Sequence, residues 1–105
     1  MKIKDTFTFE NAAEILRKEL SSHINVIVRS NILDSNKKWF DIDKSSFVGV
    51  RVTFYSDRPL VVSYVPNFFA RAFFGGLISG IFHHGARSEF KRQIEQFIIS
   101  EFYQN

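Results

Sequence analysis

The stretch Ser46-Phe-Val-Gly-Val-Arg-Val-Thr-Phe-Tyr55 decides the fold class, because it holds the clearest alternation of side-chain type in the chain. Apolar residues occupy every second position in it, namely Val48, Val50, Val52 and Phe54. Successive side chains of a strand point to opposite faces of a sheet, so a period of two predicts a strand with one buried face. Such a strand needs neighbouring strands for its backbone hydrogen bonds, and the flanking sequence contains segments that are predicted to form them.

Three further segments are predicted to be strands of the same sheet. Residues 24–30 are rich in β-branched side chains, and residues 38–43 and 60–65 continue the pattern of a half-buried sheet. Turn residues separate the segments, and Pro59 is expected in a turn because proline cannot sit in a central ladder. Since the connections are too short for crossover helices, the strands are predicted to form an antiparallel meander.

Helical periodicity appears on both sides of the predicted sheet. Residues 9–21 place apolar side chains at helical spacing, and Thr8 or Asp5 is expected to cap this helix. Residues 68–84 and 88–103 are expected to form two further helices, broken or kinked around the glycines. The apolar residues of the last helix share one face, as in a helix that covers a sheet. These residues are Phe90, Ile94, Phe97, Ile98 and Phe102.

The predicted fold class is α+β, with an N-terminal helix, a four-stranded antiparallel meander sheet and two C-terminal helices packed on one face. A chain of 105 residues has the usual length of one domain, so residues 1–105 are expected to form a single α+β domain. The hydrophobic fraction of 45% and charged fraction of 24% argue against disorder. Thirteen Phe residues indicate a packed core or a surface that meets another apolar surface.

Charge and cysteine content narrow the function classes. The formal net charge is only +3, and the 14 basic residues are spread among 11 acidic ones, so nucleic acid is not expected as a partner. Without cysteine the chain has no disulfide, thiolate nucleophile or cysteine-based metal site. Because the first residues lack the apolar stretch of a secretory signal, we expect a cytoplasmic protein, with a peripheral position at a membrane as an alternative.

No residue pattern points to catalysis or to a bound metal or cofactor. His83 and His84 are adjacent, so a regular helix turns their rings about 100° apart, and no acid lies near enough to complete a metal shell. Asp41 and Asp43 share one face of a predicted strand, where a solvated strand face explains them better than a general acid and base. We therefore expect a non-enzymatic protein without a cofactor.

The predicted helix over residues 68–84 is the best candidate for an interaction site. On a helical wheel its small residues gather on one side, while Phe, Leu and Ile fill the other. Each interior glycine costs a helix roughly 0.5 to 1 kcal/mol, so a bare stripe makes sense where another backbone comes close. The predicted interaction residues are Ala72, Gly75, Gly76, Ser79, Gly80 and His83. A basic rim beside them consists of Arg71, Arg87 and Arg92.

Several partners for this small-residue stripe remain open. They are a helix of the same domain, a second copy in a homodimer or another protein, and a lipid, membrane surface or apolar small molecule. A full membrane span is disfavoured, because residues 72–86 would extend about 22 Å across a hydrocarbon core of about 30 Å. RNA binding is a weaker alternative, since residues 46–54 carry spaced aromatics but lack the basic-Gly opening of RNA-binding strands. The sequence thus predicts a small interaction module.

Overall fold

The computed structural model describes residues 1–34, 36–66 and 75–105, with the backbone alone for residues 75–84. The described elements are β1 (Lys2–Ile3), α1 (Phe9–Glu19), β2 (Asn25–Ser30), β3 (Lys38–Asp43), β4 (Gly49–Phe54), β5 (Pro59–Tyr64), α3 (Gly75–Phe102) and β6 (Tyr103–Gln104). A four-stranded antiparallel sheet and two helices dominate this part of the chain. The predicted mixture of helices and antiparallel strands is confirmed.

The sheet contains the four central strands in the order β2-β3-β4-β5, so each strand lies beside its neighbour in the sequence. Val52, from the stretch that predicted the sheet, pairs with Phe40 on one side and Val61 on the other. Val26 pairs with Ile42 at the other edge. All three contacts between strands are antiparallel, as short connections require.

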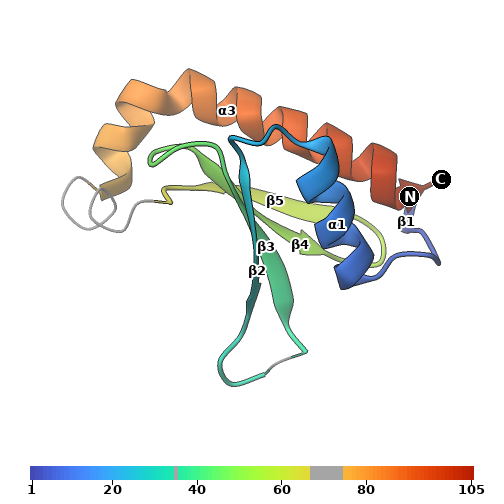
Figure 1. The fold of residues 1–105 in the computed structure, drawn as a ribbon. Coiled ribbons are helices and arrows are strands. Elements are labelled where there is room, and N and C mark those ends of the chain that lie inside the picture. Colours follow the sequence, from blue (N-terminus) through green and yellow to red (C-terminus); the bar gives the residue numbers. More distant parts are fainter. Residues whose placement is uncertain (35, 67–74) are drawn as a thin grey trace.

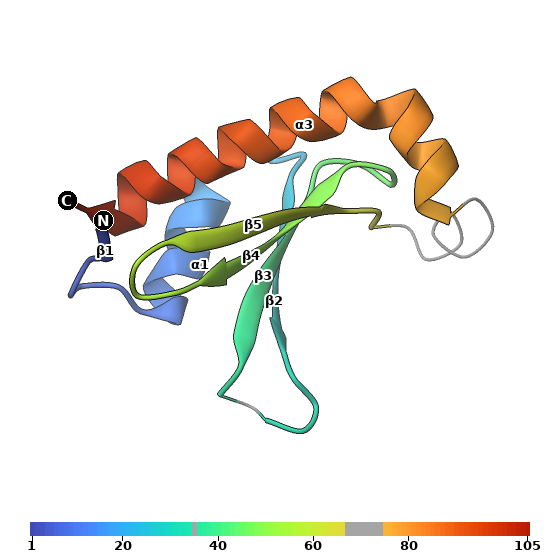
Figure 2. The same ribbon diagram turned by 180° about the vertical axis from the view of Figure 1, so that it is seen from behind.

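Both helices lie on one face of the sheet, with α3 crossing β4 and β5 and α1 beside β2 (Figure 1, Figure 2). The Thr8 hydroxyl caps α1 by accepting a hydrogen bond from the Asn11 N–H at 3.1 Å. Apolar residues of both helices meet the alternating apolar residues of the strands in one core. Its members include Ala12, Leu16, Val26, Phe40, Ile42, Val50, Val52, Val61, Phe90, Ile94, Ile98 and Phe102.

A cluster of phenylalanines joins α1, the sheet and the end of α3. The rings of Phe7 and Phe54 lie 4.6 Å apart between centroids, and those of Phe9 and Phe40 lie 5.4 Å apart. Phe102 meets Phe54 edge to face at 5.5 Å. Such aromatic pairs add to the free energy gained by burying the rings. Much of the Phe content therefore serves the internal core, one of the two roles predicted for it.

The prediction of two separate C-terminal helices is wrong for residues 75–102, which form the one helix α3. Its first turns curve away from the direction of the rest (Figure 1). A helical glycine such as Gly85 costs only about 1 kcal/mol, and no proline follows it, so the chain continues as a helix. The part of the predicted helix at residues 67–74 lies outside the described residues.

The two ends of the chain pair with each other, which the sequence analysis did not predict. Strand β1 pairs antiparallel with β6, with Ile3 opposite Tyr103 and Lys2 opposite Gln104. The backbone also joins this pair to the sheet region, because the Ile3 N–H donates to the Ser56 carbonyl at 2.8 Å. Strands of two residues carry no periodic signal, so only the fold brings them together.

Pro59 was expected in a turn, but it lies in a strand. It is the first residue of β5 and pairs with Phe54. Because β5 is the edge strand and Pro59 stands at its start, the missing N–H removes no bond from the centre of the sheet. The rule that keeps proline out of central strands therefore still holds.

Tyr103 should make the protein sensitive to alkaline pH. Its hydroxyl donates a hydrogen bond to the Tyr55 carbonyl at 2.7 Å, and burial raises the pKa of Tyr103 to about 12. A folded-state pKa above the unfolded value of about 10 means that this stabilisation is complete below pH 10 and declines as pH rises toward 12. At pH 11 we expect a loss of about 1 kcal/mol, measured by urea unfolding.

The matched variant for this test is Tyr103→Phe. It should lose about 1 kcal/mol at neutral pH, where the hydrogen bond is intact in the parent. Between pH 10 and 12 its stability should fall less steeply than that of the parent. Equal slopes for the two proteins would show that Tyr103 does not contribute to the alkaline transition.

Candidate interaction surface on the sheet

The sheet face turned away from the two helices is the best described candidate site, and we call it the open face. By the alternation of the strands, it carries the side chains that do not enter the core. They are Asn25, Ile27 and Arg29 on β2, Trp39, Asp41 and Asp43 on β3, Gly49, Arg51 and Thr53 on β4, and Leu60, Val62 and Tyr64 on β5. Both described helices, α1 and α3, pack against the opposite face of the sheet (Figure 1, Figure 2).

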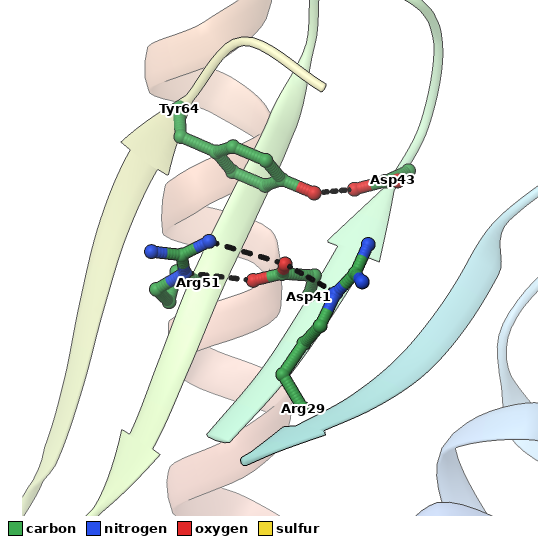
Figure 3. A network of polar contacts seen from close by, with 5 residues as sticks. All are labelled: Arg29, Asp41, Asp43, Arg51 and Tyr64. Carbon is green, nitrogen blue, oxygen red and sulfur yellow. Dashed lines mark hydrogen bonds and ion pairs between the residues drawn. The ribbon is translucent and has the colours of Figure 1, made fainter. Parts of the chain in front are cut away.

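Asp41 is the centre of a polar network on the open face (Figure 3). Arg51 holds both of its carboxylate oxygens, with Nε 2.9 Å from Oδ1 and Nη2 3.2 Å from Oδ2. From the opposite side, Arg29 Nε lies 3.3 Å from Oδ2. The two guanidiniums leave Asp41 only 2% exposed. The expectation of a solvated strand face is therefore wrong for Asp41, because cross-strand arginines cover it.

The Arg51 guanidinium lies beside two aromatic rings as well as the carboxylate. Its Cζ is 5.2 Å from the centroid of the Trp39 ring and 5.3 Å from that of Tyr64. Both distances are short enough for cation–π attraction, which stabilises the guanidinium in addition to its ion pair with Asp41. The hydrogen bond with Asp41 raises the pKa of Arg51, so the guanidinium keeps its charge. Arg51 thus links three strands of the sheet through its side chain.

Asp43 and Tyr64 form a second polar pair, in which the tyrosine hydroxyl donates to the Asp43 carboxylate (Figure 3). Partial burial is the main cause that raises the pKa of Asp43. Burial and the hydrogen bond to Asp43 raise the pKa of Tyr64. Both shifts favour the protonated forms of the two groups, so the hydroxyl and the carboxyl stay joined by their hydrogen bond.

Gly49 is required by the close approach of its neighbours on this face. A Cβ added at Gly49 would lie 2.7 Å from the Pro66 side chain and 2.9 Å from the ring of Tyr64. Gly49→Ala should therefore lower the free energy of unfolding by about 1 to 3 kcal/mol. Gly85→Ala is the matched control, because nothing lies within 4 Å of a Cβ there, and it should stabilise α3 by about 0.5 to 1 kcal/mol.

Urea unfolding of the two variants beside the parent measures this contrast. Opposite signs are expected from the same chemical change. A neutral Gly49→Ala would mean that Tyr64 and Pro66 shift at little cost, and a destabilising Gly85→Ala would show that this glycine has a close neighbour.

The outer part of the open face is apolar. On the edge strand β5, Leu60 is 45% exposed and Val62 is 48% exposed. They stand one behind the other on the same side of the strand, and Val62 pairs with Arg51. The open face therefore combines two aliphatic side chains with guanidinium groups that are about half exposed. This combination was not predicted, although the alternation of residues 60–65 contained its signal.

The residues predicted as the interaction site are only partly described. Gly75, Gly76, Ser79, Gly80 and His83 lie in the first turns of α3, where the backbone is helical as predicted. Ala72 and Arg71 lie outside the described residues.

Two members of the predicted basic rim, Arg87 and Arg92, lie among the described residues. Arg87 is partly buried on α3. Arg92 is exposed and forms an ion pair with Glu89, with Nη2 2.6 Å from Oε1. This contact is the main cause that raises the pKa of Arg92. The pair spans three residues of one helix, so it satisfies the charge locally.

Among the side chains of residues 1–34, 36–66 and 85–105, no group of three or more His, Asp or Glu is placed to hold a metal ion. The helices of the described chain contain no stretch long and apolar enough to cross a membrane. A lipid or apolar small molecule bound between the sheet and residues 68–84 would contact side chains of that segment, and these side chains lie outside the described residues.

Comparison with known proteins found no match to a family model, to a curated protein or to a solved structure.

Proposed function

We propose that this protein is a small non-enzymatic interaction module whose open face binds a segment of a partner protein. The half-exposed pair Leu60 and Val62 carries this proposal. Exposed apolar side chains that lie next to one another, with polar groups around them, are typical of protein-binding surfaces. The favoured partner segment presents apolar side chains to this pair and a carboxylate to the neighbouring guanidiniums.

A partner carboxylate is favoured because Arg29 and Arg51 keep N–H donors that Asp41 does not use. Arg51 uses Nε and Nη2 on Asp41, and Arg29 uses Nε. A guanidinium has five N–H donors, so each arginine retains some for a further acceptor. Arginine prefers carboxylate or phosphate oxygens in such contacts because the bonds are charge-assisted.

A protein segment is favoured over RNA for two reasons. Asp41 and Asp43 balance the charge of Arg29 and Arg51, so the open face lacks the row of unpaired cations that a chain of phosphates requires, whereas a single carboxylate needs only the donors that remain. The Arg51 guanidinium also lies at cation–π distance from the Trp39 and Tyr64 rings. A base that stacked on the same ring surface would have to displace this contact.

The predicted helix surface at residues 68–84 is a second candidate for partner contact. It is supported by the sequence pattern of small residues and by the helical backbone from Gly75 onward. A homodimer, a lipid or another apolar ligand at this stripe remains an alternative function, and so does a cytoplasmic protein held at a membrane surface. The open face is preferred because Leu60 and Val62 are about half exposed there beside two guanidinium groups.

Site-specific photocrosslinking in the protein's own host tests the proposal. A benzophenone side chain replaces Val62 in one variant and Ser100, exposed on α3, in the control. Crosslinks to a partner protein are expected at position 62 and not at position 100. The partner is then purified, and Leu60→Ser with Val62→Ser should weaken its binding at least about tenfold, because each side chain loses apolar burial.

Several outcomes would contradict the proposal. They are crosslinks that are equal at both positions, crosslinks at position 62 that ribonuclease removes, and an unchanged affinity of the serine variant. Crosslinks that join only two copies of the chain would assign the open face to a homodimer instead.

A further inference from the structure

The β2–β3 hairpin carries two apolar side chains in water at its tip. The hairpin projects away from the helices, and its loop forms the far end of the molecule in both views (Figure 1, Figure 2). Ile32 is 99% exposed and Leu33 is 95% exposed. No other large apolar residue among those described is as exposed as these two.

Local hydrogen bonds join the described residues of the loop that holds Ile32 and Leu33. The Asn31 side chain accepts from the Leu33 N–H at 2.8 Å, and the Asp34 side chain accepts from the Asn36 N–H at 3.0 Å. Backbone bonds from Asn31 N to the Lys37 carbonyl, at 2.9 Å, and from Lys37 N to the Asp34 carbonyl, at 3.1 Å, close the loop. The backbone therefore presents Ile32 and Leu33 outward, although neither side chain contributes to the core.

Basic residues follow directly behind the tip. Lys37 and Lys38 are exposed at the start of β3, and the Lys38 Nζ lies 5.9 Å from the centroid of the Phe9 ring. On the facing strand, the Arg29 side chain is 54% exposed and also contacts Asp41. Asp34 is the one acid among the described residues of the loop, and its carboxylate already accepts the turn hydrogen bond. The hairpin thus has an apolar end and a basic collar below it.

We propose that this hairpin tip inserts into the surface of an anionic membrane. Ile32 and Leu33 would enter the boundary between headgroups and acyl chains, where interfacial apolar groups lie. Lys37 and Lys38 would remain at the level of the anionic headgroups, because long lysine stems place the ammonium groups in water. This surface is separate from the open face, so the inference does not depend on the proposed protein partner.

A membrane suits this shape better than a protein does. Specific protein interfaces usually bury about 800 Å² on each partner, which two side chains on a projecting loop do not supply. A membrane needs no pocket that matches the shape of the protein. The hairpin can insert its apolar tip at any rotation about the membrane normal, with the basic residues at the headgroups. Electrostatic attraction and apolar insertion then act on adjacent parts of one hairpin.

Sedimentation of the full chain with vesicles tests the inference. The probe is phosphatidylcholine vesicles with about a quarter phosphatidylserine, compared with pure phosphatidylcholine, at low and high salt. We expect binding to the anionic vesicles at low salt, weakened by high salt. Ile32→Ser with Leu33→Ser should reduce the partition by about a hundredfold, roughly tenfold for each side chain. Lys37→Gln with Lys38→Gln should reduce it by about fivefold per lysine.

The control variant is Leu60→Ser with Val62→Ser, which removes the same number of apolar side chains from the open face. It should bind vesicles like the parent. Circular dichroism should show all variants folded, because Ile32 and Leu33 are almost fully exposed. The proposal is overturned if the parent does not bind anionic vesicles at low salt, or if the Ile32/Leu33 variant binds as well as the parent. Equal loss in the control variant, or a dimer in light scattering that disappears in the tip variant, would also overturn it.

Discussion

Replacing Ile98 by alanine should lower the free energy of unfolding by about 2 to 5 kcal/mol. Ile98 is fully buried, at 0% exposure, in the core between α3 and the sheet. Removal of its buried methyl and methylene groups costs both the transfer free energy and the cavity left behind. Urea unfolding, followed by circular dichroism, measures the change.

The next residue of the same helix provides the control. Ile99 is only partly buried, so Ile99→Ala should cost about 1 kcal/mol. The comparison keeps the residue type, the helix and the change in helix propensity constant, and varies only the burial. Similar losses for the two variants would mean that α3 does not meet the sheet through the face that contains Ile98.

Replacing Arg51 by methionine should destabilise the protein by about 2 to 3 kcal/mol. The change leaves the Asp41 carboxylate, which is 2% exposed, with Arg29 as its remaining partner at 3.3 Å. A buried charge that loses its main partner is costly, although Arg51 is itself 44% exposed, which reduces the effect. The cation–π contacts with Trp39 and Tyr64 are lost as well.

Arg29→Met is the matched control, since it removes the other arginine from the same carboxylate. Arg29 makes one longer bond and is 54% exposed, so we expect a loss of about 1 kcal/mol or less. In the double variant Asp41→Leu with Arg51→Met, part of the stability should return, because no carboxylate is then left unpaired. Equal losses for the two arginine variants, or no recovery in the double variant, would contradict the assignment of Arg51 as the main partner.

The strand pattern was predictable because it depends on neighbouring residues. The alternation around Val52 identified the core face of β4, and Thr8 was one of two predicted caps for α1. The C-terminal helix showed its buried face in the spacing of Phe90, Ile94 and Ile98. Gly85 lies within the single helix α3, although it was predicted to help break or kink the helical region. A glycine indicates a weak point in a helix, but its local sequence does not show whether the surrounding structure tolerates it.

The candidate site was less predictable, because its residues come together only in the folded sheet. Asp41 and Arg51 are ten residues apart in the chain, and of the two only Asp41 was predicted to lie on a solvated strand face. Their ion pair depends on the register that places them opposite each other across β3 and β4. A register shift by one residue would move Arg51 to the other face, so the alternation alone could not identify the pair.

By itself, the sequence determined the four strands of the central sheet, the helical character of the segments before and after them, and which of their faces are apolar, since side-chain periodicity is a local property of the chain. Only the tertiary structure decided which charges neutralise one another and which apolar residues stay in water. The burial of Asp41 by two arginines and the exposure of Ile32 and Leu33 both follow from long-range placement. The physical reason is that an ion pair or a solvent-exposed patch depends on distances between elements, which a linear pattern does not contain.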